Sequence, residues 1–298
     1  MRTYSICVLF LSFVVGLIVV DTQANRSYST NPASYPNNVD FKAKRIISLS
    51  PAITELVFSA GAGSKLVGVS RFSDFPSEAR LIPEIGDAYS LDLERIVELN
   101  PELIIAWSQA SIHKDLDRFN HLGFQVLKIE IKNLQDIPNL IRLIGKLAET
   151  DEQAELTASQ FEKILLRIKQ NNESGALIKA LQLIWLQPLI TFGKDHLINE
   201  ILGVCGGENV ANFFSGNTFT LSTESMVAAN PEVIFNSTAA LPAEVRQLFR
   251  KLSSIGAVKN DHIFFIPPDL ISRETVRVLD AIQMVCNYFD EIRVKMYP

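Results

Sequence analysis

The sequence lacks the features that mark two large classes of protein. It has no block of basic residues: 28 lysines and arginines stand against 33 aspartates and glutamates, for a formal net charge of −5. A surface that binds nucleic acid requires clustered positive charge, so nucleic acid is not expected as a partner. Beyond the N-terminal segment, no apolar run has the roughly 20 residues that a membrane-spanning helix needs.

The motifs of common enzymes are also missing. The sequence contains no Gly-x-Ser-x-Gly, no phosphate-binding Walker loop and no His-Glu-x-x-His. Its four histidines are never at the spacing of metal ligands on one face, so no metal site is expected. Gly61-Ala62-Gly63 follows a predicted helix and lacks a third glycine, which indicates a helix end and not a dinucleotide loop. We therefore expect no catalytic residues, and an exported α/β enzyme that uses cleft carboxylates is the alternative from another class.

The N-terminus has the composition of an export signal. Met1-Arg2 precedes an apolar run from Ile6 to Val20, and small residues follow at Thr22 and Ala24. This pattern predicts a signal peptide over residues 1–24, cleaved after Ala24, and hence a periplasmic protein. An uncleaved membrane anchor is the alternative, for which the run is short. Residues 25–43 are rich in Asn, Ser, Tyr and Pro, which predicts a disordered leader.

Removal of the signal leaves two cysteines, Cys205 and Cys286. In an oxidising compartment an even pair is first a candidate disulfide. Each cysteine continues the apolar face of a predicted helix, so a bridge would attach the last helix to the second half of the chain. Two free, buried thiols are the alternative reading.

One stretch occurs twice. The segment from Asp92 to Ile105 returns as the segment from Ser222 to Phe235, with Glu, Val, Asn-Pro-Glu and an apolar run at one constant offset. Each copy predicts a capped helix, a stop before proline and a buried strand. Glu94 and Glu224 fall in the first helical turn, where the helix dipole favours a carboxylate. A repeat at this separation indicates two similar α/β lobes.

The remaining chain supports this organisation. Strands and helices alternate in both halves, and residues 134–170 form an almost continuous helical pattern, in which Thr150 and Gln153 have the spacing of a capping box. We expect an N-terminal lobe over 44–146, a connecting helix over 147–174 and a C-terminal lobe over 175–298. The predicted fold is α/β, with two Rossmann-like parallel-sheet lobes joined by one long rigid helix and a ligand cleft between the lobes.

Aromatic side chains gather on the loops that should border this cleft. Ligands of open α/β sheets bind beyond the carboxyl ends of the strands. The residues on such loops are Phe72, Phe75, Trp107, Phe192 and Phe219, together with Asp269 and Arg273. Flat apolar walls with an acidic and a basic group suit a large, partly planar ligand. Any single aromatic is more often core filling, but several on equivalent loops favour a binding role.

From Arg45 to Arg293 the sequence resembles the periplasmic cobalamin-binding proteins of ABC importers, within the wider class that carries siderophores and haem. The resemblance lies in Leu49-Ser50-Pro51-Ala52-x-Thr54-Glu55-Leu56, Leu93-Glu94-Arg95-Ile96-Val97, Ile105-Ala106-Trp107, Gly193-Lys194 and Val204-Cys205-Gly206-Gly207-Glu208-Asn209. It implies a binding protein without a cofactor, whose ligand is cobalamin or another corrinoid, and a monomer is expected. A ferric siderophore or haem is the alternative ligand, which would favour more basic cleft residues than Arg71 and Arg273.

The resemblance also implies roles for individual residues. The ligand-binding set is Pro51, Phe72, Trp107, Phe219, Asp269 and Arg273, with Phe72 where a tyrosine is familiar. Glu94 and Glu224 occupy the positions that dock onto arginines of the membrane permease subunits, and the cysteine pair matches the family's disulfide. The tryptophans expected near Ala88 and Thr218 are missing, with Tyr89 and Phe219 beside those positions. This departure bears on which ligand fits.

Overall fold

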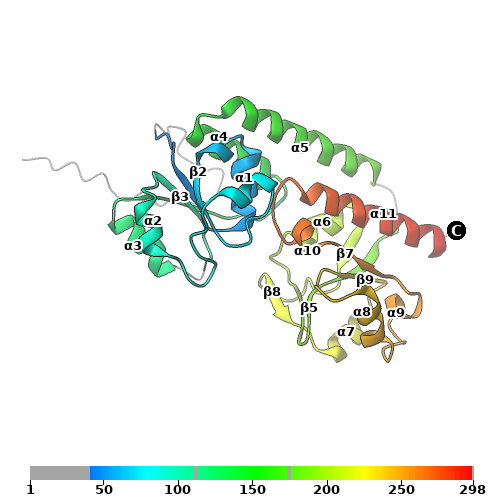
Figure 1. The fold of residues 1–298 in the computed structure, drawn as a ribbon. Coiled ribbons are helices and arrows are strands. Elements are labelled where there is room, and N and C mark those ends of the chain that lie inside the picture. Colours follow the sequence, from blue (N-terminus) through cyan, green and yellow to red (C-terminus); the bar gives the residue numbers. More distant parts are fainter. Residues whose placement is uncertain (1–40, 111–112, 173–175, 297–298) are drawn as a thin grey trace, which may run out of the picture.

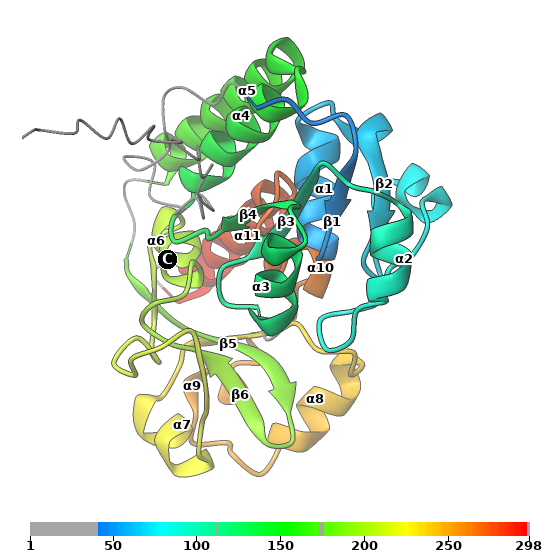
Figure 2. The same ribbon diagram turned by 90° about the vertical axis from the view of Figure 1, so that its left-hand side faces the viewer.

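The computed structural model describes residues 41–110, 113–172 and 176–296, and the predicted signal peptide lies outside these residues. Two lobes are joined by a long helix (Figures 1 and 2). The predicted leader ends within the described part, where Ala43 is buried and its amide donates to the carbonyl of Leu147 at 2.7 Å. The helices of the described part are each too short or too polar to cross a lipid bilayer.

The first lobe contains a four-stranded sheet that is parallel throughout, in the order β2-β1-β3-β4. Its elements are β1 (Ile46–Ser48), α1 (Pro51–Ser59), β2 (Leu66–Val69), α2 (Leu93–Glu98), β3 (Leu103–Trp107), α3 (His113–His121) and β4 (Gln125–Ile129), with 3₁₀ turns at Gly63–Lys65 and Ser77–Leu81. Successive strand residues face opposite sides of the sheet. Ile46 and Ile105 thus join the core under α1, while Ile47 and Ile104 join the core under α2 and α3.

The connection between the lobes is one long helix, as predicted, which is α5 (Asp151–Asn171). It is preceded by α4 (Asp136–Ala148), and the two helices pack side by side (Figure 2). Glu149 separates them with a left-handed backbone, φ 54°. The predicted capping box is wrong, because the Thr150 hydroxyl accepts no backbone N–H of α5 and instead donates to the Ala60 carbonyl at 2.6 Å. The turn is thus held by a contact with the first lobe, and α5 alone continues to the second lobe (Figure 1).

The second lobe is only partly the parallel sheet that the sequence predicts. Its strands are β5 (Ile178–Leu186), β6 (Leu189–Phe192), β7 (Gly207–Asn209), β8 (Thr218–Thr220), β9 (Val233–Asn236) and β10 (Ile263–Phe265). Its helices are α6 (Ile198–Val204), α7 (Thr223–Ala229), α8 (Pro242–Phe249), α9 (Gly256–Lys259), α10 (Pro268–Ile271) and α11 (Val278–Met296). The strands β10, β9, β5 and β7 pair in parallel, whereas β6 and β8 are antiparallel. The cause is a tight β5–β6 hairpin, which can only join antiparallel strands.

The sequence repeat is also a structural repeat. Asp92 and Ser222 accept the backbone N–H three residues later, as helix caps do, and Asn100 and Asn230 are both left-handed, with φ 44° and 42°. The glutamate of each Asn-Pro-Glu accepts a backbone N–H at the first strand of its own lobe: Glu232 from Lys179 at 2.8 Å, and Glu102 from Lys44 at 2.5 Å. This gives the repeated glutamate a structural role in both lobes.

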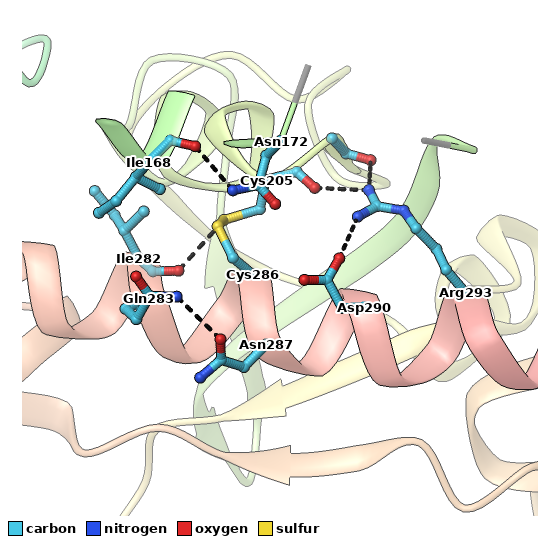
Figure 3. Close-up of a disulfide and its surroundings, with 10 residues drawn as sticks. Ile168, Asn172, Cys205, Ile282, Gln283, Cys286, Asn287, Asp290 and Arg293 are labelled. Carbon is cyan, nitrogen blue, oxygen red and sulfur yellow. Dashed lines mark hydrogen bonds and ion pairs between the residues drawn. A yellow bond between two sulfur atoms is a disulfide. The ribbon is translucent and has the colours of Figure 1, made fainter. Parts of the chain in front are cut away.

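One hydrophobic cluster extends through both lobes, with α1, α4 and α5 on one side and α6 and α11 on the other. The disulfide between Cys205 and Cys286 confirms the predicted bridge and holds the end of α6 against α11 (Figure 3). Beside it, Arg293 of α11 donates to the Cys205 carbonyl at 2.7 Å, one of the carbonyls that the end of α6 leaves unpaired. The start of α6, which borders the cleft, is therefore carried on a fixed helix.

Candidate ligand-binding cleft

A cavity of about 1290 Å³ lies between the lobes and is lined by residues of both. This volume exceeds the range of roughly 300–1,000 Å³ that holds drug-sized ligands. On the first lobe it touches the residues after all four parallel strands, which is where the sheet topology predicts a ligand. On the second lobe it touches the loop before α6, a stretch at Gly216 and Asn217, and Glu274. We call the lining residues of the first lobe the first wall of the cleft and those of the second lobe the second wall. The cleft can therefore hold a large ligand between these two walls.

Three of the predicted ligand-binding residues lie in the first wall: Pro51, Phe72 and Trp107. Pro51 is the first residue of α1, immediately after Ser50. Trp107 ends β3, and its indole N–H donates to the Ser50 hydroxyl at 2.9 Å. The hydrogen bond fixes the plane of the indole ring, so an apolar face is held in place at the cavity.

Two exposed aromatics border the same wall. Phe72 is 69% exposed and Tyr89 is 88% exposed, although large aromatic side chains are usually well buried. Phe72 also has a left-handed backbone, φ 67°, which costs a residue with a Cβ about 1–3 kcal/mol and is typical of functional sites. Asp87 accepts the backbone N–H groups of Tyr89 and Ser90, and these two bonds lower the pKa of its carboxyl group. The strained Phe72 and the anchored Tyr89 loop form an aromatic rim.

The loop before α6 forms much of the second wall. α6 begins at Ile198, and the carboxylate of Asp195 in the preceding loop accepts the Gly216 N–H at 2.7 Å. Gly193 lies so close to this stretch that a Cβ there would be 2.4 Å from the Gly216 carbonyl oxygen. The Asp195 bond and the side-chain-free Gly193 hold the loop against the neighbouring strand connection.

This loop carries a histidine that faces a glutamate of the same wall. His196 Nε2 lies 4.0 Å from the Glu274 carboxylate, and both side chains line the cavity. Burial lowers the pKa of His196 to about 4, and burial likewise raises the pKa of Glu274. Neither residue belongs to the set predicted from the sequence. The Gly193-Lys194 motif two residues before His196 is the one signal that points to it, and nothing in the sequence distinguishes Glu274.

The other predicted ligand residues, Phe219, Asp269 and Arg273, are not among the described residues that line the cavity. Phe219 packs against Phe214, with ring centroids 3.9 Å apart. Arg273 forms an ion pair with Asp269 at 3.0 Å and two more with carboxylates of the first lobe. A ligand contact for these three residues stays a prediction, and for Arg273 the structure gives a second role.

That role is a cluster of charges across the interface of the lobes. Glu55 of α1 is 2% exposed, and its carboxylate accepts from Arg273 at 2.9 Å, from Arg277 at 2.5 Å and from the Thr275 hydroxyl at 3.0 Å. Arg273 also contacts Asp74 at 2.8 Å, and this contact lowers the pKa of Asp74 against the opposing effect of burial. We call Glu55, Asp74, Arg273, Thr275 and Arg277 the interlobe cluster. It joins helix α1 of the first lobe to the segment between α10 and α11.

Within residues 41–110, 113–172 and 176–296, no group of three or more His, Cys, Asp and Glu side chains could hold a metal ion. The lining combines aromatic faces with charged and polar groups, which suits a ligand held by contact over a large surface.

Comparison with known proteins identifies the family. The family model for periplasmic binding proteins matches residues 46–270. The chain belongs to the periplasmic binding protein family. The vitamin B12-binding protein of Vibrio cholerae is 31% identical over 248 residues, covering 83% of this chain and 90% of that protein. The vitamin B12-binding protein of Vibrio campbellii is 31% identical over 263 residues, covering 88% and 94%.

Solved structures of the family agree. The crystal structure of the periplasmic vitamin B12-binding protein BtuF of Vibrio cholerae matches with a TM-score of 0.79 and 30% identity, covering 85% of this chain and 99% of that one. The haem-binding protein HutB of Vibrio cholerae matches with a TM-score of 0.71 and 24% identity, which supports the fold alone. The two-lobed α/β fold predicted from the sequence is thereby confirmed.

Proposed function

We propose that this protein captures cobalamin, or a closely related corrinoid, in the periplasm and delivers it to an ABC importer of the inner membrane. The observation that carries the proposal is the cavity of about 1290 Å³ between the lobes, with Trp107 fixed in its wall and Phe72 and Tyr89 at its rim. A corrin ring is large and nearly planar, so it matches this cavity in size and in its need for flat apolar contacts. The vitamin B12-binding relatives support the same ligand.

The charges of the lining favour a corrinoid over haem or a ferric siderophore. The acidic lining residues are Asp87, Glu130, Asp195, Glu200 and Glu274, and the basic ones are Arg71, Lys132 and Lys194. Arg71 pairs with Asp87 at 3.2 Å and Lys132 pairs with Glu130 at 3.2 Å, so two of the three positive charges are already matched. The carboxylates of haem require free positive charge. The amide groups around a corrin ring do not.

The test is a calorimetric titration of residues 25–298 with cyanocobalamin. We expect saturable binding to one site per chain, with the ligand recovered unchanged, because a binding protein does not turn over its ligand. Trp107→Ala should weaken binding about tenfold or more, as for a buried aromatic contact. Trp185→Ala is the matched control, since Trp185 is exposed and is not among the described lining residues. Binding of haem without binding of cyanocobalamin would contradict the proposal.

We further propose that Glu94 and Glu224 dock onto the membrane permease. Both are exposed, and each has an exposed valine three residues later on the same short helix, Val97 and Val227. The two lobes thus present the same charged and apolar pair, which suits a partner with two equivalent positive sites. A monomer carries both sites.

The docking proposal is tested with Glu94→Arg combined with Glu224→Arg. The double variant should lose cobalamin uptake in cells and keep its affinity for cyanocobalamin in solution. Glu152→Arg, on the exposed side of α5, is the control and should keep both. Export is tested separately by sequencing the N-terminus of the mature protein, for which we expect Asn25 as the first residue. Uptake at the normal rate by the double variant would eliminate the docking role.

A further inference from the structure

The side chains of His196 and Glu274 lie next to each other in the second wall of the cleft. His196 comes from the loop before α6, and Glu274 comes from the segment between α10 and α11. The side chains around Glu274 in the sequence, Arg273 and Thr275, bind Glu55 in the interlobe cluster. Glu274 lines the cavity instead. The cluster therefore anchors the backbone on both sides of a glutamate that is free to contact a ligand.

The hydrogen bonds of His196 fix its proton. Nδ1 accepts the backbone N–H of Ile198 at 3.0 Å, so the proton of the neutral ring is on Nε2. The ring is stacked on Phe192, with centroids 3.6 Å apart and an angle of 12° between the planes, which fixes its orientation. The side chain is 12% exposed, and burial keeps the ring neutral at pH 7. His196 thus presents an N–H donor to the side of Glu274.

Glu274 supplies an acceptor next to this donor. Its side chain is 25% exposed, and within the described residues no lysine or arginine forms an ion pair with it. The distance of 4.0 Å to His196 Nε2 is too long for a hydrogen bond, so the donor and the acceptor do not satisfy each other. A ligand that offers an acceptor to His196 Nε2 and a donor to the Glu274 carboxylate can form a hydrogen bond with each of them.

From this geometry we infer that His196 and Glu274 together recognise a primary carboxamide of the ligand and reject a carboxylate at the same position. The amide carbonyl accepts from His196 Nε2, and the amide NH₂ group donates to the Glu274 carboxylate. A ligand carboxylate has no proton to donate and meets a like charge. The inference rests on the proposed function, because the corrin ring of cobalamin carries primary carboxamide side chains on its rim.

Derivatives of cyanocobalamin in which one side-chain amide has been hydrolysed to the acid test this directly. For each monocarboxylic acid, the ratio of its Kd to that of cyanocobalamin is measured at pH 7 by calorimetry. We expect the wild-type protein to bind at least one derivative about tenfold more weakly. Glu274→Gln should bring that ratio close to one, because the glutamine amide can donate to the ligand carboxylate. Glu152→Gln, on the exposed side of α5 and outside the described lining of the cavity, is the matched control and should leave the ratio unchanged.

The outcomes separate this inference from the proposed function. Failure of the wild-type protein to bind cyanocobalamin would overturn both. Binding of cyanocobalamin with equal affinities for all the acids, or with a ratio that Glu274→Gln leaves unchanged, would overturn the carboxamide site and leave cobalamin as the ligand. Circular dichroism would show whether the glutamine variant folds. If it folds poorly, Glu274→Ala removes the same negative charge and allows the same measurement of the Kd ratio.

Discussion

Glu55→Gln should strongly destabilise the protein, although Glu55 is in the first lobe and its two arginine partners are in the second. The Glu55 carboxylate is 2% exposed and accepts from Arg273, Arg277 and Thr275. Arg273 and Arg277 are themselves only 14% and 17% exposed. The substitution keeps the size of the side chain, removes its negative charge and leaves one oxygen in place of two to accept these bonds.

The partners left behind set the size of the effect. Arg273 keeps Asp74 at 2.8 Å and Asp269 at 3.0 Å. Within the described residues, the guanidinium group of Arg277 keeps only its cation–π contact with the ring of Phe75, 4.1 Å from the centroid. Breaking a buried pair by removing one partner costs about 3–5 kcal/mol, because the other charge stays buried. We expect a loss of about 3 kcal/mol, since glutamine can still accept one hydrogen bond.

Urea denaturation measures this loss, and the two tryptophans report on the lobes separately. Trp107 is in the first lobe and Trp185 in the second, so Trp185→Phe and Trp107→Phe backgrounds follow one lobe each. Asp261→Asn is the matched control, because it neutralises an exposed partner of Arg246, with side chains 69% and 44% exposed. Such surface pairs contribute about 0–1 kcal/mol.

A loss for Glu55→Gln no larger than that for Asp261→Asn would refute the reasoning, since it would show that the buried cluster does not stabilise the fold. The two lobes provide a second criterion. If the cluster couples them, their transitions should coincide in the wild-type protein and move apart in the variant. Transitions that stay together in both would mean that the shared hydrophobic cluster is sufficient to couple the lobes.

Three further predictions concern the second lobe. Reduction of the Cys205–Cys286 bridge, whose cysteines are 81 residues apart, should lower the free energy of unfolding in urea by up to about 4 kcal/mol, because the unfolded chain regains the entropy of a long loop. The double variant Cys205→Ser with Cys286→Ser should show the same loss and should not respond to reductant. The pKa of His196 is about 4 in the folded protein and 6.5 in the unfolded chain, so the unfolded chain takes up the proton first as the pH falls. The free energy of unfolding should therefore decrease by about 3 kcal/mol between pH 6.5 and pH 4. His196→Gln should flatten that part of the curve of stability against pH, whereas an unchanged slope would show that His196 is not buried in the neutral form. Glu274 has the opposite sign, since its raised pKa means that stability is lost as the pH rises above 4.5, and Glu274→Gln should abolish that loss.

The parts of the fold that could be predicted from the sequence are those with local causes. The caps at Asp92 and Ser222 act on their own helices, and a proline after Asn100 or Asn230 ends each helix whatever surrounds it. The four strands of the first lobe follow from short apolar runs between helices, and the confirmed cysteine bridge follows from apolar helical spacing together with export.

The errors have long-range causes. The Thr150 hydroxyl binds the carbonyl of Ala60, which is 90 residues away, and Glu149 adopts a left-handed backbone that its sequence does not indicate. The turn between α4 and α5 therefore depends on contacts that the local sequence does not contain. The pairing of Arg273 with Glu55 was not predicted either, because Glu55 is 218 residues earlier in the chain. A partner at that distance leaves no pattern in one sequence.

The interlobe cluster also bears on how a ligand enters the cleft. To swing the lobes apart, the Glu55 carboxylate would have to leave two arginines and the shared hydrophobic cluster would have to open, so we expect the lobes to stay together. The start of α6 is fixed on the disulfide-linked α11, and Trp107 is fixed on Ser50. The side chains of the rim residues Phe72 and Tyr89 are instead largely exposed. A ligand that fills this cleft should therefore move the rim side chains by several ångströms at most and the lobes by less, and crystal structures with and without cyanocobalamin would show which of the two moves.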